Sequence, residues 1–304
     1  MTALLAMFSS TNFWMGFAGL FYLFVGVFVY RREIGTARGM GKLVVLGIVF
    51  VASSLAAFAP EHFRGPEFIQ GMVPSWMPVR HFWPAFIGCA LLAAATSLST
   101  KRCVRLSASL LALMFAIFVC VDYLPSAFSH PGYRFGWVYM LRDSSFAAGA
   151  LALAGLHRRG DSPRLSSAMI SIGRLVMAVA AIYFAAELLL YPGFAPGVPA
   201  EMPTPSWVPI PKFWGYLTGS VLLLAGIPLA LDRKPRMAAV VIGALMTALT
   251  LFLYVPMLAF ARGGSAGGIN EALNYIADTL LYAGMALALA SALGSGREPS
   301  SRHE

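Results

Sequence analysis

The sequence predicts an all-α membrane protein with nine transmembrane helices, one N-terminal helix followed by two parallel-repeat four-helix bundles. Three observations lead to this prediction. The 304 residues are 59% hydrophobic and only 12% charged, with a mean hydropathy of +0.73, whereas soluble globular proteins contain about 25% charged residues. Apolar runs long enough to cross a bilayer recur along the chain. In addition, one stretch of the sequence occurs twice.

The first apolar run, Phe13–Tyr30, ends at Arg31 and Arg32, with no basic segment before it and no small-residue cleavage pattern after it. These features favour a retained transmembrane helix over a signal peptide. Each of the later apolar runs predicts one further spanning helix: Leu43–Ala59, Phe82–Leu98, Leu106–Val121, Trp137–Leu156, Leu175–Leu190, Phe213–Leu231, Met237–Phe260 and Tyr275–Leu293.

The repeated stretch reads VPSWMPVRHFWPAFIG at residues 73–88 and TPSWVPIPKFWGYLTG at residues 204–219, an offset of 131 residues. Seven of its positions are identical without a gap, including both tryptophans of each copy. Self-similarity at a fixed spacing indicates a repeated structural unit.

The similarity extends beyond this stretch. Further identical residues keep the same offset or, after four inserted residues, an offset of 135: Arg105/Arg236, Tyr123/Tyr254, Pro125/Pro256, Asp143/Asp278 and Gly149/Gly284. We therefore expect two tandem copies, at about 41–157 and 172–293. The chain then divides into an N-terminal transmembrane helix at 1–36, a first bundle at 37–160, and a second bundle with a short cytoplasmic tail at 161–304.

Arginine and lysine are distributed unevenly over the connections between the apolar runs. Sixteen lie in one set of alternate connections, and six lie in the other: Arg64, Arg80, Arg134, Arg142, Lys212 and Arg262. Because positively charged residues are retained in the cytoplasm, this pattern predicts an inner-membrane protein with its N-terminus outside and its C-terminus in the cytoplasm. Each copy has an even number of spans, so both copies enter the bilayer in the same direction, as parallel repeats do.

Composition and motifs exclude several other classes of protein. The net charge of +9 is explained by membrane topology, so we expect the lipid bilayer and not nucleic acid as a partner. The three cysteines, Cys89, Cys103 and Cys120, form no CxxC pair, which argues against a dithiol oxidant. The external histidines show no metal-ligand spacing, and we expect no metal site.

A family resemblance rests on the segment Glu61-His62-Phe63 through Gly65-Pro66-Glu67-Phe68 to the sequence MVPSWMP at residues 72–78. In this segment the chain resembles the DoxX family of small bacterial membrane proteins, which carry a similar stretch after their first helix and fold as four-helix bundles. The second copy departs from the pattern, since Thr204 replaces the valine and no histidine precedes it. The resemblance implies a subunit or accessory of a quinone-linked membrane oxidoreductase, with quinone as cofactor and a redox subunit as partner.

Acidic residues inside apolar runs are the candidates for catalysis, because an uncompensated acid at a helix centre costs ~2.5–3.5 kcal/mol. Glu187 lies about one turn before the outer end of its helix, and Asp278 lies about one turn inside the last helix. Asp143 is the repeat equivalent of Asp278. One interpretation makes Glu187 the centre of a proton-handling site in the second bundle, with Lys212 as its partner and with Asp278 and Asn274 at similar depth. The other interpretation is that these acids cap or cross-link neighbouring helices.

A quinone headgroup needs apolar walls and one or two hydrogen-bond partners. The two external motif stretches contain both kinds of residue, and the candidate ligand-binding residues are Trp76, Arg80, His81, Trp83, Trp207, Lys212 and Trp214. An aromatic belt at the membrane interface gives the same pattern.

Three functions therefore stay open. The first, which we favour, is a subunit or accessory of a quinone-linked oxidoreductase. The second is a non-enzymatic membrane scaffold or assembly partner, because the sequence contains no GxGxxG, P-loop, GxSxG or CxxCH motif. The third is a small-molecule carrier with a path between the two bundles.

Overall fold

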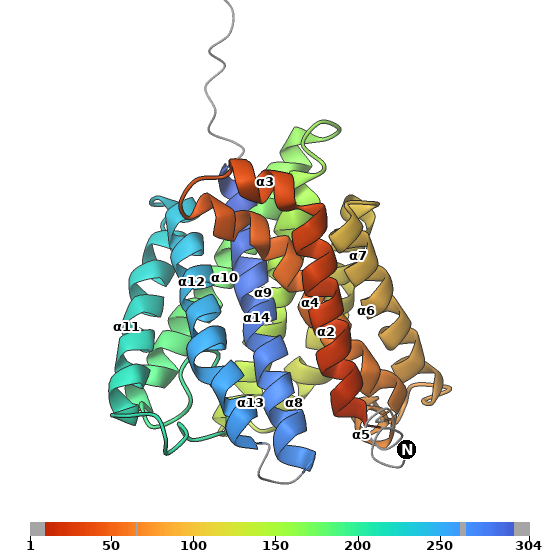
Figure 1. The fold of residues 1–304 in the computed structure, drawn as a ribbon, viewed down its shortest axis with the longest axis vertical. Helices are drawn as coiled ribbons and strands as arrows, with labels where there is room; N and C mark the ends of the chain where they lie inside the picture. Colours follow the sequence, from red (N-terminus) through yellow and green to blue (C-terminus); the bar gives the residue numbers. More distant parts are fainter. Residues whose placement is uncertain (1–9, 65, 262–265, 295–304) are drawn as a thin grey trace, which may run out of the picture.

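The computed structural model describes residues 10–64, 66–261 and 266–294, and these residues form helices and loops with no β-strand among them (Figure 1). The long helices run between two ends of the molecule. One end carries the short helix α3 (Arg31–Thr36), and the other carries α5 (Pro66–Met72), α8 (Leu124–Ser129) and α13 (Val255–Ala261) (Figure 1). We call these the α3 end and the α8 end.

Within the described part of the chain, eight helical segments are long and apolar enough to cross a membrane. They are α2 (Thr11–Val29), α4 (Gly41–Arg64), α6 (Phe82–Thr100), α7 (Val104–Phe118) continued by the π-helix η1 (Val119–Tyr123) and α8, α10 (Pro163–Leu190), α11 (Pro211–Ala230), α12 (Pro235–Leu249) continued by the π-helix η2 (Thr250–Tyr254) and α13, and α14 (Ala266–Gly294). The prediction of an all-helical, multi-pass membrane protein is confirmed.

One further long helix, α9 (Arg134–Leu156), has 23 residues but is less apolar, because it contains Arg134, Arg142 and Asp143. It runs between the same two ends as its neighbours (Figure 1) and packs against α7, α10 and α14. Most of its residues face protein, so its charged side chains can be compensated by other side chains instead of facing lipid. That α9 is a ninth spanning helix stays a prediction.

Helices α9 and α14 lie against each other at the centre of the molecule. Around them, α4 packs on α6 and α14, α10 packs on α11 and α9, α7 packs on α9, and α12 packs on α14, whereas α2 lies outside, on α4 and α6. Glycine allows this close packing: a Cβ added to Gly149 would lie 2.4 Å from the Cβ of Met285, and one added to Gly284 would lie 2.7 Å from the carbonyl oxygen of Gly47. One continuous hydrophobic core therefore includes residues of both halves of the chain.

Several local features of the structure recur at the sequence offset of 131 residues. The π-helices η1 and η2 end at Tyr123 and Tyr254. Trp83 and Trp214 each donate their indole N–H, over 2.9 Å, to the carbonyl of a proline five residues earlier. Three pairs of non-glycine residues with positive φ also keep this offset: Val79/Ile210, Lys101/Asp232 and Cys103/Lys234.

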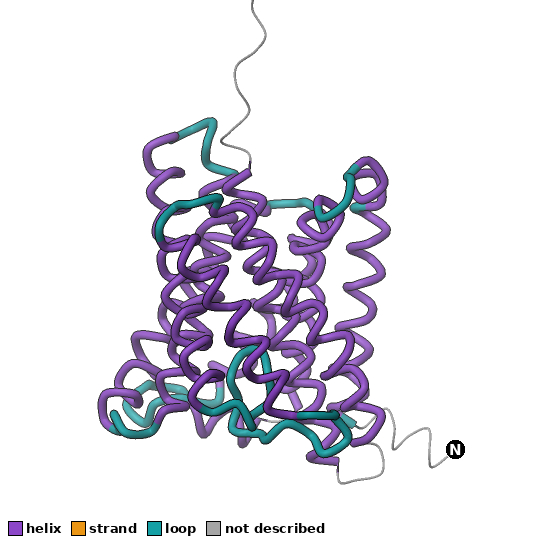
Figure 2. The backbone as a smooth tube through the Cα atoms, turned by 90° about the vertical axis from the view of Figure 1, so that its left-hand side faces the viewer, coloured by secondary structure: helices purple, strands orange, loops and turns teal. Residues whose placement is uncertain are grey.

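The two halves differ most in one connection at the α8 end. In the first half, the connection from α4 to α6 contains the helix α5. In the second half, the connection from α10 to α11 contains residues 193–204, a hairpin-like segment bridged between Phe194 and Pro203. We call residues 193–204 the strap. Its residues 195–200 are all buried, and Figure 2 shows the loops of this end in teal, one of them rising between the helices.

Candidate functional site

The central feature of the site is an arginine that bonds to two carboxylates from two helices. Arg142 on α9 donates from Nε to Oδ1 of Asp143 and from Nη1 to Oδ2 of Asp278 on α14, both over 2.9 Å. Its third nitrogen, Nη2, lies 3.4 Å from the hydroxyl of Tyr123, the last residue of η1. We call these four residues the ionic centre. The side chains of Arg142, Asp143 and Asp278 are 18%, 6% and 21% exposed, so the charges interact largely out of contact with solvent.

The ionic centre lies well inside the helices. At ~1.5 Å per residue, Arg142 lies ~12 Å from the first residue of α9, and Asp278 lies ~18 Å from the first residue of α14. The expectation that Asp278 lies about one turn inside its helix is therefore wrong. The polar turns before it are helical, because side-chain hydrogen bonds hold Asn270 and Asn274 inside the bundle.

Charge is not balanced within the ionic centre. Two carboxylates face one guanidinium, which leaves one negative charge when both acids are ionised. An uncompensated charge in a low-dielectric interior is costly. A proton on one of the two carboxylates makes the group neutral, so binding and releasing a proton is the chemistry that this arrangement can perform.

A stripe of polar residues leads from the α8 end to the ionic centre. Asn270, Asn274, Asp278 and Tyr282 follow at four-residue intervals on α14, a spacing that places them on one face of the helix. Oε1 of Glu61, at the end of α4, accepts from the amides of Asn270 and Asn274 over 2.7 and 2.8 Å. The same face continues with alanines after Tyr282, so the polar stripe extends from the α8 end only to the middle of α14.

A small cavity adjoins the ionic centre. Its volume is about 30 Å³, which is room for a water molecule. The residues that line it come from α9, α14 and the strap: Tyr139, Arg142, Val198, Pro199, Ala200, Tyr275, Asp278 and Thr279. Polar side chains therefore form one wall of the cavity, and the buried part of the strap forms another.

Glu187 lies in a second, separate ion pair. It bonds to Nη1 of Arg134, the first residue of α9, with both side chains mostly buried. The guanidinium of Arg134 also lies over the rings of Phe135, Tyr191 and Phe194, at 4.1, 4.1 and 4.3 Å from their centroids. Glu187 thus joins the second half of the chain to the first.

Lys212, the partner expected for Glu187, and Asp278 and Asn274, expected at similar depth, have other surroundings. Lys212, at the start of α11, is exposed, and the cation bound to Glu187 is Arg134. Asp278 bonds to Arg142 and Asn274 bonds to Glu61, so neither side chain is hydrogen-bonded to Glu187. The reason is helix rotation, since α10 turns Glu187 toward α9 and away from α11.

Four of the seven candidate ligand-binding residues have structural contacts of their own. Trp83 and Trp214 bond to proline carbonyls, and Trp207 stacks on Phe260 with ring centroids 5.0 Å apart. Arg80 donates to the carbonyls of Gln70 and Val73 over 2.7–3.1 Å, which fixes the end of α5. The remaining three are exposed: Trp76, His81 and Lys212. None of the seven lines the cavity beside Arg142.

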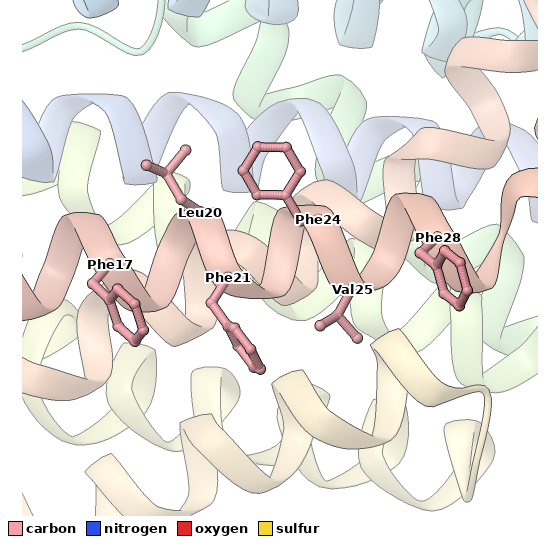
Figure 3. Close-up of a pocket in the computed structure, with 6 residues that line it drawn as sticks. All are labelled: Phe17, Leu20, Phe21, Phe24, Val25 and Phe28. Atoms are coloured by element: carbon pink, nitrogen blue, oxygen red, sulfur yellow. The ribbon is translucent and has the colours of Figure 1, made fainter.

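A larger, apolar groove of about 520 Å³ lies on the surface of α2. Six side chains of this one helix form it: Phe17, Leu20, Phe21, Phe24, Val25 and Phe28 (Figure 3). Among the eight membrane-span candidates, α2 is the least buried. Lipid chains are the natural neighbours of such a surface in a membrane protein.

Sequence reasoning named Asp143 and Asp278 but missed Arg142, the residue that joins them. Arg142 was counted as a loop cation in the topology argument and noted as the neighbour of Asp143, but it was given no role in joining the two acids. The four-residue spacing of Asn270, Asn274, Asp278 and Tyr282 was a second available signal.

A family model described as a domain of unknown function (DUF8561) matches residues 51–189. The matched region begins within α4 and ends within α10, so it includes α9 with Arg142 and Asp143 as well as Glu187. No curated protein and no solved structure matches the chain.

Proposed function

We propose that the protein is a proton-linked carrier of the inner membrane and that the ionic centre holds its transported or coupling proton. The observation that carries the proposal is the bonding of Arg142 to both Asp143 and Asp278. Two carboxylates on one guanidinium need one proton for neutrality, and intramembrane acids with this arrangement are typical of proton relays in pumps and transporters. The proton is held while the site is closed and leaves when water reaches the carboxylates.

The proposal includes the architecture predicted from the sequence: nine spanning helices, with two parallel four-helix repeats after the first helix. It is supported by the features that recur at an offset of 131 residues, among them the tyrosines that end η1 and η2. The helices of the two halves also have the same pattern of neighbours, with α4 on α6 and α14, and α10 on α11 and α9. The ionic centre then lies where the two repeats meet, as binding sites do in many carriers.

Access to the proton site is proposed from the α8 end. The polar stripe that begins at Asn270 reaches Asp278 from this end, whereas apolar side chains fill the bundle on the side of the α3 end. The uneven distribution of arginine and lysine predicts that the α8 end is external. When the site opens at this end, protons therefore exchange with the outside.

The quinone-linked role implied by the DoxX resemblance stays a prediction with its own test. Native mass spectrometry of gently solubilised protein would report bound quinone and partner subunits together. A co-purifying quinone supports that role, and a co-purifying soluble subunit without quinone supports a scaffold.

The proton site can be tested by infrared spectroscopy of the purified protein in lipid. A protonated carboxyl group gives a carbonyl stretching band that shifts in heavy water. We expect this band in the unmodified protein and its loss in Asp278→Asn or Asp143→Asn. Asp161→Asn is the matched control, because Asp161 is an exposed acid paired with Arg105. If neither substitution in the ionic centre changes the band, the proposal is wrong.

A further inference from the structure

Three hydrogen bonds within the strap hold it together as a compact unit. The amide of Ala195 donates to the carbonyl of Met202 over 3.0 Å, and the amide of Thr204 donates to the carbonyl of Gly193 over 2.9 Å. The hydroxyl of Thr204 also donates to the carbonyl of Phe194 over 2.9 Å. Because these bonds are internal to residues 193–204, they do not have to break when the strap moves relative to the helices.

A tyrosine hydrogen bond connects the middle of the strap to the helices beside the cavity. Tyr254, the fully buried last residue of η2, donates its hydroxyl to the carbonyl of Pro196 over 2.9 Å. Its ring stacks on Tyr275, a residue of the cavity wall, with centroids 5.8 Å apart. Gly197 follows Pro196 with a φ of +125°, and a Cβ added there would lie 3.5 Å from the Tyr254 hydroxyl. The strap therefore fits closely against Tyr254.

The repeat equivalent of Tyr254 has a different partner. Tyr123 ends η1, and its hydroxyl lies 3.4 Å from Nη2 of Arg142. The two tyrosines occur at the same position of the two π-helices, and π-turns within helices are frequent at functional sites. Tyr123 is thus part of the ionic centre, and Tyr254 is bonded to the strap, which lines the cavity beside that centre.

The N-terminal side of the strap has a second attachment. Phe194 and the preceding Tyr191 lie over the guanidinium of Arg134, whose charge is paired with Glu187. This contact lies at the edge of the strap, whereas Val198, Pro199 and Ala200 line the cavity. The edge is thus a fixed point about which the buried part can swing.

We infer that the strap is the external gate of the proton site and that Tyr254 is the positioning residue that holds it closed. Movement of residues 195–200 away from Tyr254 removes one wall of the cavity and exposes Asp278 and Arg142 to water from the α8 end. The inference rests on the proposed function, because it takes the cavity beside the ionic centre as the site that is gated.

The test measures how fast a membrane-impermeant thiol reagent, added outside, reaches the cavity wall. Thr279→Cys places a reporter in that wall, in a background in which the exposed Cys89, Cys103 and Cys120 are replaced by serine. We expect slow labelling of the parent and labelling about fivefold faster in Tyr254→Phe, the factor that corresponds to one lost neutral hydrogen bond. Tyr30→Phe is the matched control, and we expect no change in its labelling rate, because it loses a buried tyrosine–carbonyl hydrogen bond of 3.0 Å, to Leu98, that does not involve the strap.

A second pair of variants tests the same gate without changing Tyr254. Gly197→Ala strains a backbone with φ of +125°, a conformation that residues with a side chain rarely adopt, so we expect faster labelling. Gly193→Ala lies in the same strap, where an added Cβ meets nothing within 4 Å, and should label at the parent rate. The gate is overturned if labelling is unchanged in both Tyr254→Phe and Gly197→Ala. If Tyr254→Phe does not fold, unchanged labelling in Gly197→Ala alone overturns it. The labelling rate does not depend on a bound proton, so failure of the gate and failure of the infrared test are separate results.

Discussion

Arg142 on α9 and Asp278 on α14 are joined by a hydrogen bond of 2.9 Å, although 136 residues separate them in the sequence. The bond links the last long helix of the first half to the last helix of the second. Because Arg142 also bonds to Asp143, the predicted repeat equivalent of Asp278, one guanidinium bonds to both acids. The pair is therefore both a structural connection between the halves and the core of the proposed proton site.

Removing the guanidinium should destabilise the protein strongly. In Arg142→Leu, Asp143 and Asp278 lose their counter-charge, and breaking a buried ion pair from one side costs ~3–5 kcal/mol. Thermal unfolding in detergent measures the loss. Arg105→Leu is the control, since its exposed pair with Asp161 contributes ~1 kcal/mol or less. Adding Asp278→Asn to Arg142→Leu should recover part of the stability, because one unpaired charge is removed. Equal losses in Arg142→Leu and Arg105→Leu would contradict the buried ion pairs of the ionic centre.

Glu187→Gln should leave Arg134 in its aromatic surroundings without a counter-charge. The side chains of Glu187 and Arg134 are only 10% and 21% exposed, so we expect a loss of thermal stability of ~2–4 kcal/mol. Lys212→Gln, on the exposed residue first expected to pair with Glu187, should change stability by less than ~0.5 kcal/mol. If Glu187→Gln keeps full proton-linked transport and full thermal stability, then Glu187 neither handles protons nor cross-links its neighbouring helices.

The central crossing of α9 and α14 should not tolerate a methyl group. In Gly149→Ala the new Cβ would meet the Cβ of Met285 at 2.4 Å and its Cα at 2.8 Å, which forces the helices apart at a cost of ~1–3 kcal/mol. Gly16→Ala in α2 is the same substitution at a position with nothing within 4 Å and should be neutral or slightly stabilising. The comparison is made by thermal unfolding, and a neutral Gly149→Ala would argue against this packing.

Cysteine labelling of intact cells should report the predicted membrane orientation. Single cysteines at four exposed positions of the α3 end, Thr36, Lys101, Asp161 and Lys234, should be protected from an impermeant reagent. Cysteines at the exposed residues His130 and Glu201 of the α8 end should be labelled from outside. Because positively charged residues are retained in the cytoplasm, labelling at any α3-end position from outside would reject the orientation.

Much of the fold could be read from contiguous sequence. Membrane insertion depends on hydropathy summed along one helix, and for this reason the apolar runs from Phe13–Tyr30 onward predicted the spanning helices with small errors at their ends. The exceptions are α10, which begins at Pro163 and not near Leu175, and α14, which begins at Ala266 and not near Tyr275. The first turns of α14 are polar, and Glu61 on another helix accepts hydrogen bonds from Asn270 and Asn274 there.

The sequence by itself also predicted that Asp143 and Asp278 are repeat-related acids within apolar regions, since a repeat offset is a property of the linear chain. Only the tertiary structure decided that Arg142 joins them, that Arg134 pairs with Glu187, and that a loop rich in proline and glycine is buried beside the cavity. These contacts depend on how each helix is rotated about its axis and on which distant helices it packs against. Side-chain packing over the whole bundle sets those rotations, and no local pattern in the sequence contains them.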